Sequence, residues 1–265
     1  MVLPPVKSQK KSDVSSSPAF IRRKFFVKRD MKRFYKDVGV NGKAGKGYAI
    51  CLDKRPVKTP AGRELRAPGR KLAKVVAAEW AAQEEAILPG TMPLTQLLIT
   101  ALDRVADSRT EMEQQVLDYL DTDLVCYRAG RPDDLAAAVA AAWDPWCAWF
   151  EKTYGTKLKT TTELAALVQP SAAHRAMRIA VADLDDMRFT ALQMVTATAG
   201  SLVLALAFVK GALPPGDLFD AIHVEEQYKA ALYREDVHGP APQEEKKQQA
   251  AMQDLTAART FLDCL

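Results

Sequence analysis

The sequence offers little that could hold a metal ion or a framework of disulfides. Its four cysteines form no C-x-x-C pair, and its three histidines include no H-E-x-x-H motif. The acidic run of Asp118, Asp121 and Asp123 lacks the glycine and the distal glutamate of a calcium-binding loop. We therefore expect no metal site. Widely spaced cysteines of this kind are typical of ordinary thiols in a reducing compartment.

Motifs for nucleotide binding and nucleophilic catalysis are also missing. The glycine-rich segment around Gly42 resembles a phosphate-binding loop, but Val40 and Gly47 occupy the positions where that motif requires glycine and a hydroxyl residue. Short strand-like segments flank it, which predicts a hairpin turn. No G-x-S-x-G motif is present either. The sequence therefore predicts a protein that is not an enzyme and carries no cofactor.

The excess of positive charge is confined to the start of the chain. Residues 1–36 contain eleven Lys and Arg but only two Asp, a net charge of +9, so that a total of +4 leaves −5 for the remainder. An acidic body argues against a nucleic-acid-binding domain. We expect residues 1–30 to be a basic, disordered tail, without the apolar core of a secretory signal. A bacterial cytoplasmic location is favoured, with the mitochondrial matrix as the alternative.

Long uninterrupted apolar runs are absent. The most apolar stretch, Phe189–Val209, contains Gln and Thr, and its continuous part, Leu202–Val209, is far shorter than the about 20 residues of a spanning helix. We expect one buried helix here, with Gly200 and Ser201 allowing a neighbouring element to approach closely. Stable membrane insertion is not expected.

The hydrophobic pattern changes its period near Pro68. Before it, short segments between residues 33 and 67 predict β-hairpins; after it, Leu72, Val76 and Trp80 follow the spacing of one helical face. The predicted fold is α+β, with a basic tail at 1–30, a small β-rich N-terminal domain with helices at 31–112, and a larger all-helical bundle domain at 113–265. Later helices are expected at 94–105, 111–120, 132–143, 145–154, 171–184, 187–210, 218–233 and 244–265.

Several motifs then occur together in an order that resembles one protein family. They are YAICLDKRPVKTPAG, AAEWAAQ, TMPLTQL with TALDRV, DYLDTDLVCYRA, FTALQ, GSLVLALA and VEEQY. Together they resemble the chaperone family that assembles the F1 sector of ATP synthase by binding its α subunit. The similarity extends from about residue 33 to residue 265.

This resemblance implies a fold and a partner. It implies a β-rich N-terminal domain followed by a helical one, in agreement with the change of period. It also implies that the protein, a monomer when free, holds the F1 α subunit until the β subunit takes its place. A subunit surface that is normally buried associates wrongly while it is exposed, which is the physical need for such a cover.

Two motifs supply candidate client-binding residues through the resemblance. In the E-W-x-x-Q motif they are Glu79, Trp80 and Gln83. Trp80 shares an apolar face, so a role in the core is favoured over an exposed contact.

The second motif, VEEQY, supplies further candidates from the helical part. They are Glu225, Glu226 and Tyr228. The sequence departs from the family pattern here, with Lys229 in place of the usual Gln and Tyr233-Arg234 in place of Trp-Gly. An acidic pair is most often a solvated helix face, but a rim carboxylate can also pair with a basic residue of a client and orient it.

A different class of function stays open on the residues alone. Lys54, Arg55 and Lys58 lie in the basic hairpin motif and could grip an anionic small molecule in an enzyme. Exposed Lys and Arg on a hairpin more often serve solubility.

Overall fold

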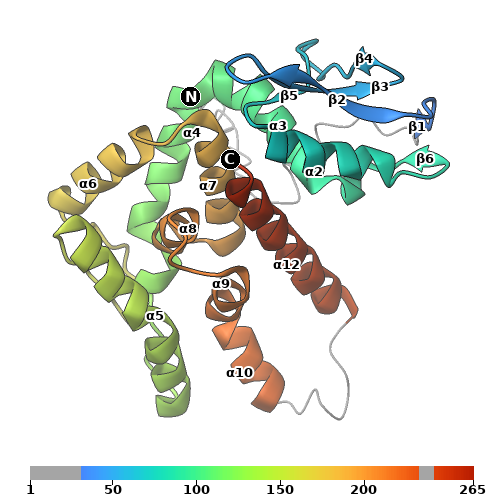
Figure 1. Cartoon of the computed structure of the whole chain (residues 1–265). Helices are drawn as coiled ribbons and strands as arrows, with labels where there is room; N and C mark the ends of the chain where they lie inside the picture. The colour runs from blue at the N-terminus through green and yellow to red at the C-terminus, as the bar shows by residue number, and fades with distance from the viewer. Residues whose placement is uncertain (1–30, 233–241) are drawn as a thin grey trace, which may run out of the picture.

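A computed structural model describes residues 31–232 and 242–265. Short antiparallel strands lie at one end of the molecule, and helices form the rest (Figure 1). The predicted α+β class is confirmed. The predicted tail at 1–30 lies outside the described residues.

The strands form one four-stranded and one two-stranded antiparallel sheet. The β2–β3 hairpin turns at the glycine-rich segment, where Gly45 and Gly47 adopt φ values of +78° and +73° that favour glycine. This confirms a hairpin in place of a phosphate loop. The strands are β1 (Met31–Lys32), β2 (Val38–Lys43), β3 (Gly47–Leu52), β4 (Arg55–Pro56), β5 (Arg66–Ala67) and β6 (Ala86–Ile87). Strands β2, β4 and β5 all pair with β3, and β1 pairs with β6.

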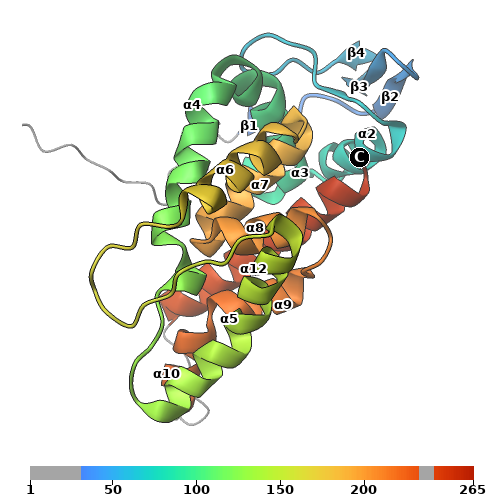
Figure 2. The same cartoon turned by 90° about the vertical axis from the view of Figure 1, so that its left-hand side faces the viewer.

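The helices surround one buried member. Helix α8 packs among α5, α7, α9 and α12 (Figures 1 and 2), while α2 lies against the sheet. The α-helices are α2 (Arg70–Ala81), α3 (Pro93–Thr100), α4 (Ala106–Leu117), α5 (Asp133–Tyr154), α6 (Ser171–Ala182), α7 (Asp186–Ala199), α8 (Leu202–Val209), α9 (Pro215–Ile222), α10 (Val224–Leu232) and α12 (Pro242–Asp263). Shorter 3-10 turns are η1 (Pro89–Thr91), η3 (Asp118–Thr122) and η4 (Leu124–Cys126), and η2 (Ala101–Val105) is a π-helix.

Helix α5 passes through a proline that was expected to begin a new helix. The sequence predicts separate helices at 132–143 and 145–154, but α5 continues without a break through Pro145 to its left-handed cap at Gly155. Trp143 and Phe150, on either side of the proline, are both buried in the same core. Burying two such side chains contributes about 3–6 kcal/mol, at least as much as the roughly 3 kcal/mol cost of proline in a helix.

The apolar stretch expected to be one helix is two. Gly200 ends α7 with φ at +63°, and Ser201 begins α8 by accepting a hydrogen bond from the backbone of Leu204 at 3.0 Å. Gly200 and Ser201 were expected to let a neighbouring element approach closely. They instead cap the end of α7 and the start of α8. Within the described ranges, every helix is too short or too polar to cross the bilayer core.

The helix expected at 218–233 is also divided. His223 leaves helical geometry between α9 and α10, with φ −114° and ψ 14°. Its ring Nδ1 lies 2.8 Å from the carbonyl oxygen of Phe219, and its ring packs at a tilt against the Phe219 ring, with 4.2 Å between the centroids. This local contact ends α9 and sets the start of α10.

Buried apolar side chains form two clusters. The first lies between the sheet, α2 and α3 and includes Ile50 and Trp80. The second fills the helical part and includes Phe189. Helix α12 contributes Phe261 to the first cluster and Leu255 to the second. The predicted domain boundary therefore stays a prediction, because one helix belongs to both cores.

Candidate functional site

Glu79 of the E-W-x-x-Q motif caps the start of α3. Its carboxylate oxygens accept hydrogen bonds from the backbone of Leu94 and from both the backbone and the hydroxyl of Thr95, each at 2.7 Å. Burial raises the pKa of this carboxyl, while the same hydrogen bonds oppose the rise. A negative charge at the first turn of a helix satisfies free N–H groups and the helix dipole.

Gln83 of the same motif holds the loop that follows α2. Its side-chain oxygen accepts a hydrogen bond from the backbone of Leu88 at 2.7 Å, and its amide donates to the hydroxyl of Thr91 at 3.1 Å. The residue is 5% exposed. Arg33 donates to its backbone carbonyl. Gln83 therefore acts as an internal tie between α2 and the segment leading to α3.

Trp80 lies inside the N-terminal core, as its apolar face predicts. It is 5% exposed, and its backbone carbonyl accepts a hydrogen bond from the buried hydroxyl of Tyr35 at 2.7 Å. The two rings lie 6.0 Å apart between centroids. The structure thus brings Glu79, Trp80 and Gln83 together, but places them in the packing of α2 against α3 and the loop.

The candidates of the second motif lie on α10, far from α2 (Figure 1). Glu226 is exposed and Glu225 is half-buried. The hydroxyl of Tyr228 donates to the carboxylate of Asp134 at 2.9 Å, which joins α10 to the first turn of α5. That contact raises the pKa of the Tyr228 hydroxyl, because the neighbouring carboxylate disfavours its ionised form.

Helices α5, α9 and α10 bring further acidic side chains to this end of the molecule. Asp133 precedes Asp134 at the start of α5, and Asp220 of α9 accepts a hydrogen bond from Gln227 of α10 at 3.1 Å. Helices α5, α9 and α10 pack against one another here. Negative charge around Glu226 suits a partner that presents Lys or Arg.

The basic hairpin candidates are arranged along the sheet. Lys54 and Arg55 are exposed, and Lys54 occupies a tight turn with φ +68°. The ammonium of Lys58 lies 3.8 Å from the Glu64 carboxylate. Within the described part of the chain, no group of three or more His, Cys, Asp and Glu could hold a metal ion.

Comparison with known proteins identifies the family. Residues 32–151 match the model of the ATP12 chaperone protein. Atp12 from Paracoccus denitrificans is 30% identical, with a TM-score of 0.80, over 88% of this chain and 98% of that one. This chain belongs to the ATP12 chaperone family. A single-residue variant of the same P. denitrificans protein matches equally, over 97% of its length. A protein from Agrobacterium tumefaciens is 32% identical, with a TM-score of 0.81, over 88% of this chain and 85% of that one.

Membership in the ATP12 family makes this chain a chaperone of ATP synthase assembly. Most of the motifs that carry the resemblance serve the fold. The carboxylate of Asp103, in TALDRV, binds the turn of KTPAG through Thr59 and Ala61. Sequence reasoning missed this link, although a lone Asp in a helix and a T-x-x-G turn are both common partners in such contacts.

Asp123 is a second residue whose importance the sequence did not reveal. It is fully buried, and its carboxylate accepts hydrogen bonds from the backbone of Val125 at 3.2 Å and of Val203 at 3.0 Å. Burial raises its pKa to about 6, while these hydrogen bonds and the Ser201 hydroxyl oppose the rise. The DTD motif thus anchors η4 to the start of the buried helix α8.

Proposed function

We propose that this ATP12 family member binds the free α subunit of the F1 sector and covers its subunit interface until the β subunit replaces it. Family membership supports the assembly role, and the resemblance of its motifs supports the choice of the α subunit. The protein acts by contact, without catalysis and without a cofactor. Its place of action is a bacterial cytoplasm or the mitochondrial matrix.

The observation that carries the proposed site is the orientation of VEEQY. The side chains of Glu79, Trp80 and Gln83 are engaged inside the fold, whereas Glu226 on α10 faces outward in an acidic setting. We propose that Glu225, Glu226 and Tyr228 contact the client, and that the E-W-x-x-Q residues support the fold. An exposed carboxylate of this kind contributes more to orientation and association rate than to affinity.

A temporary cover must bind firmly and still exchange. This requirement suits an interface of standard size, about 1,200–2,000 Å² in total, in place of a larger permanent one. The chain is expected to be a monomer when free, and competition by the β subunit then removes it. Release by competition requires no nucleotide hydrolysis by the chaperone.

Co-purification with separately expressed subunits tests the proposal. The tagged full chain should retain the α subunit, should not retain the β subunit alone, and should lose α when β is added. Light scattering by aggregates of the isolated α subunit should be lower in the presence of the chain than in its absence. Equal solubility of α with and without the chain, together with no co-purification, would contradict the proposed function.

A further inference from the structure

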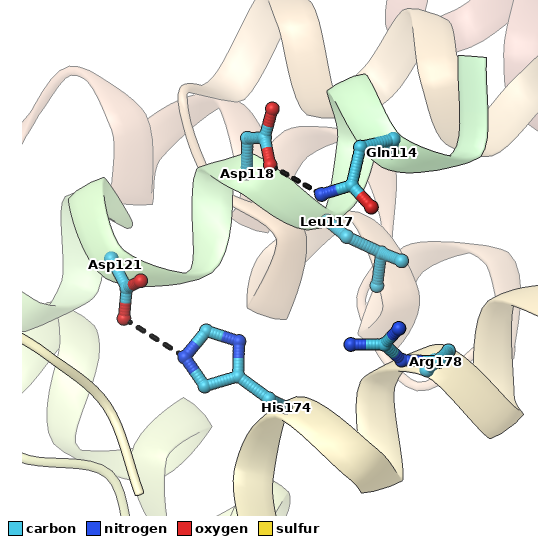
Figure 3. A pocket seen from close by; sticks show the side chains of 6 residues that line it. All are labelled: Gln114, Leu117, Asp118, Asp121, His174 and Arg178. Carbon is cyan, nitrogen blue, oxygen red and sulfur yellow. Dashed lines mark hydrogen bonds and ion pairs between the residues drawn. The ribbon is translucent and has the colours of Figure 1, made fainter. Parts of the chain in front are cut away.

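A pocket of about 150 Å³ lies between two helical segments, α4 with its extension η3 and α6. Figure 3 shows α4 and its extension η3 on one side and α6 on the other. Two residues one turn apart on α6 face four residues that follow one side of α4 and η3. The lining consists of Gln114, Leu117, Asp118, Asp121, His174 and Arg178.

The acidic groups of the pocket already have partners. Asp118 Oδ1 accepts a hydrogen bond from the Gln114 amide at 2.6 Å. Asp121 Oδ1 accepts one from the backbone of Gln169 at 2.7 Å and lies 3.1 Å from His174 Nε2. The imidazole is therefore oriented by Asp121, and its other ring nitrogen lies on the side of the pocket nearer Arg178 (Figure 3).

The guanidinium of Arg178 is the group without a partner. Among residues 31–232 and 242–265, it has no ion pair or hydrogen bond, and it points toward the His174 ring across the pocket (Figure 3). Its five N–H donors and permanent charge match a carboxylate, which they can bind through two parallel hydrogen bonds.

The size of the pocket limits what it can hold. Its volume is well above the about 10–15 Å³ that one water needs, but below the about 300–1,000 Å³ of a site for a cofactor or a drug-sized ligand. A single side chain fits this range. Two exposed apolar residues lie near the lining in sequence: Ile179, 71% exposed, follows Arg178, and Val168, 69% exposed, precedes Gln169, whose backbone donates to Asp121. A protein partner would cover such side chains, whereas a free ion would not.

We propose that this pocket receives the carboxylate of an Asp or Glu side chain of the protein client, bound by the guanidinium of Arg178. The proposal rests on the proposed function, since it adds a second contact that complements the acidic surface of α10. The client then meets an acidic surface on α10 and the guanidinium of Arg178 on α6. Two contacts of opposite sign specify one orientation of the client.

A titration without any client tests the chemistry of the pocket. The imidazole signals of the full chain are followed by NMR, and a His174→Gln variant assigns the signal of His174. Acetyl-glutamate amide should shift that signal in a saturable way at millimolar concentration, acetyl-lysine amide should not, and Arg178→Ala should abolish the shift. No saturable shift, or equal shifts with both compounds, would overturn the proposal.

A binding measurement with the F1 α subunit tests its use. Arg178→Ala should weaken binding about five- to tenfold, the loss expected for one charge-assisted contact at a partly exposed site. Arg175→Ala is the matched control, since Arg175 is also exposed on α6 but does not line the pocket. Equal affinity of both variants overturns the pocket as a client site and leaves the proposed function standing. Absence of binding by the unaltered chain overturns the proposed function, and the titration then decides whether the pocket binds carboxylates.

Discussion

The carboxylate of Asp103 accepts a hydrogen bond from the hydroxyl of Thr59, with 2.8 Å between the two oxygens. Its second oxygen accepts one from the backbone of Ala61 at 3.0 Å. Asp103 lies in the π-helix η2 and Thr59 in the turn after β4, so the contact joins the sheet to the helix that leads into the helical part. Two of the family motifs are in this sense one structural unit.

Replacement of Asp103 by Asn should destabilise the fold. The amide keeps one acceptor oxygen, but its NH₂ group cannot accept a hydrogen bond, so the two charge-assisted hydrogen bonds from Thr59 and Ala61 cannot both be kept. We expect the free energy of unfolding to fall by about 1–3 kcal/mol. Urea denaturation measures it. Asp107→Asn is the control. The Asp107 side chain is 56% exposed, so its ion pair with Arg63 should contribute less than about 1 kcal/mol to the free energy of unfolding.

Glu79→Gln should weaken the start of α3. Glu79 presents both oxygens to three donors, and glutamine can satisfy only those that face its single oxygen. The expected loss is about 1–3 kcal/mol of unfolding free energy. The exposed Glu84→Gln should change it by less than about 0.5 kcal/mol. If the two variants unfold at the same urea concentration, the cap contributes nothing.

Asp123 should make stability depend on pH in a direction opposite to that of most carboxylates. Burial raises its folded pKa to about 6 from the ordinary value of 3.8, so the folded state holds the proton more tightly. The stabilisation from this proton is complete below the unfolded pKa and is lost as pH rises through about 6. A shift of this size corresponds to about 3 kcal/mol at most.

Comparison with Asp123→Asn isolates this effect from the other carboxyl groups. Unfolding free energies of both proteins are measured by urea between pH 7 and pH 4.5. Because asparagine does not titrate, the stability of the unaltered chain relative to the variant should increase as the pH falls. A difference that stays constant or shrinks toward low pH would show that the buried carboxyl keeps an ordinary or lowered pKa.

Glu226→Lys should leave the fold intact and weaken capture of the α subunit. The residue is exposed, so its replacement should change the unfolding free energy by less than about 0.5 kcal/mol. Reversal of its charge should slow association, most clearly at low ionic strength. Glu151→Lys makes the same charge change at the opposite, C-terminal end of α5 and serves as control. Normal capture by a folded Glu226→Lys protein would remove this residue from the proposed site.

The sequence predicted the parts of the fold that depend on periodicity. The apolar face of Leu72, Val76 and Trp80 and the glycine turn of the β2–β3 hairpin are both present. The residues that cap or interrupt helices were harder to predict from the sequence. Pro145 was expected to divide α5 and does not, because both halves pack into one core; Gly200 divides α7 from α8 although the apolar pattern continues across it.

The candidate site shows a similar division. The resemblance identified the motifs, but their residues could not be sorted into interior and surface from sequence. Glu79 looks like a surface carboxylate until its donors in α3 are known, whereas Glu226 has the same residue type and faces outward. Contacts between distant segments, such as Asp121 with His174, have no local signature in the chain.

Phe261 of α12 and Cys264, which follows the helix, lie in the N-terminal core, and Lys71 at the start of α2 donates to the Asp263 carbonyl at 2.6 Å. During synthesis, the sheet and α2 leave the ribosome long before these residues do. The apolar surface of the N-terminal core that α12 covers therefore stays exposed while the intervening helices are made. The N-terminal core is therefore complete only after the last residues of the chain have been made, although most of that core is made first.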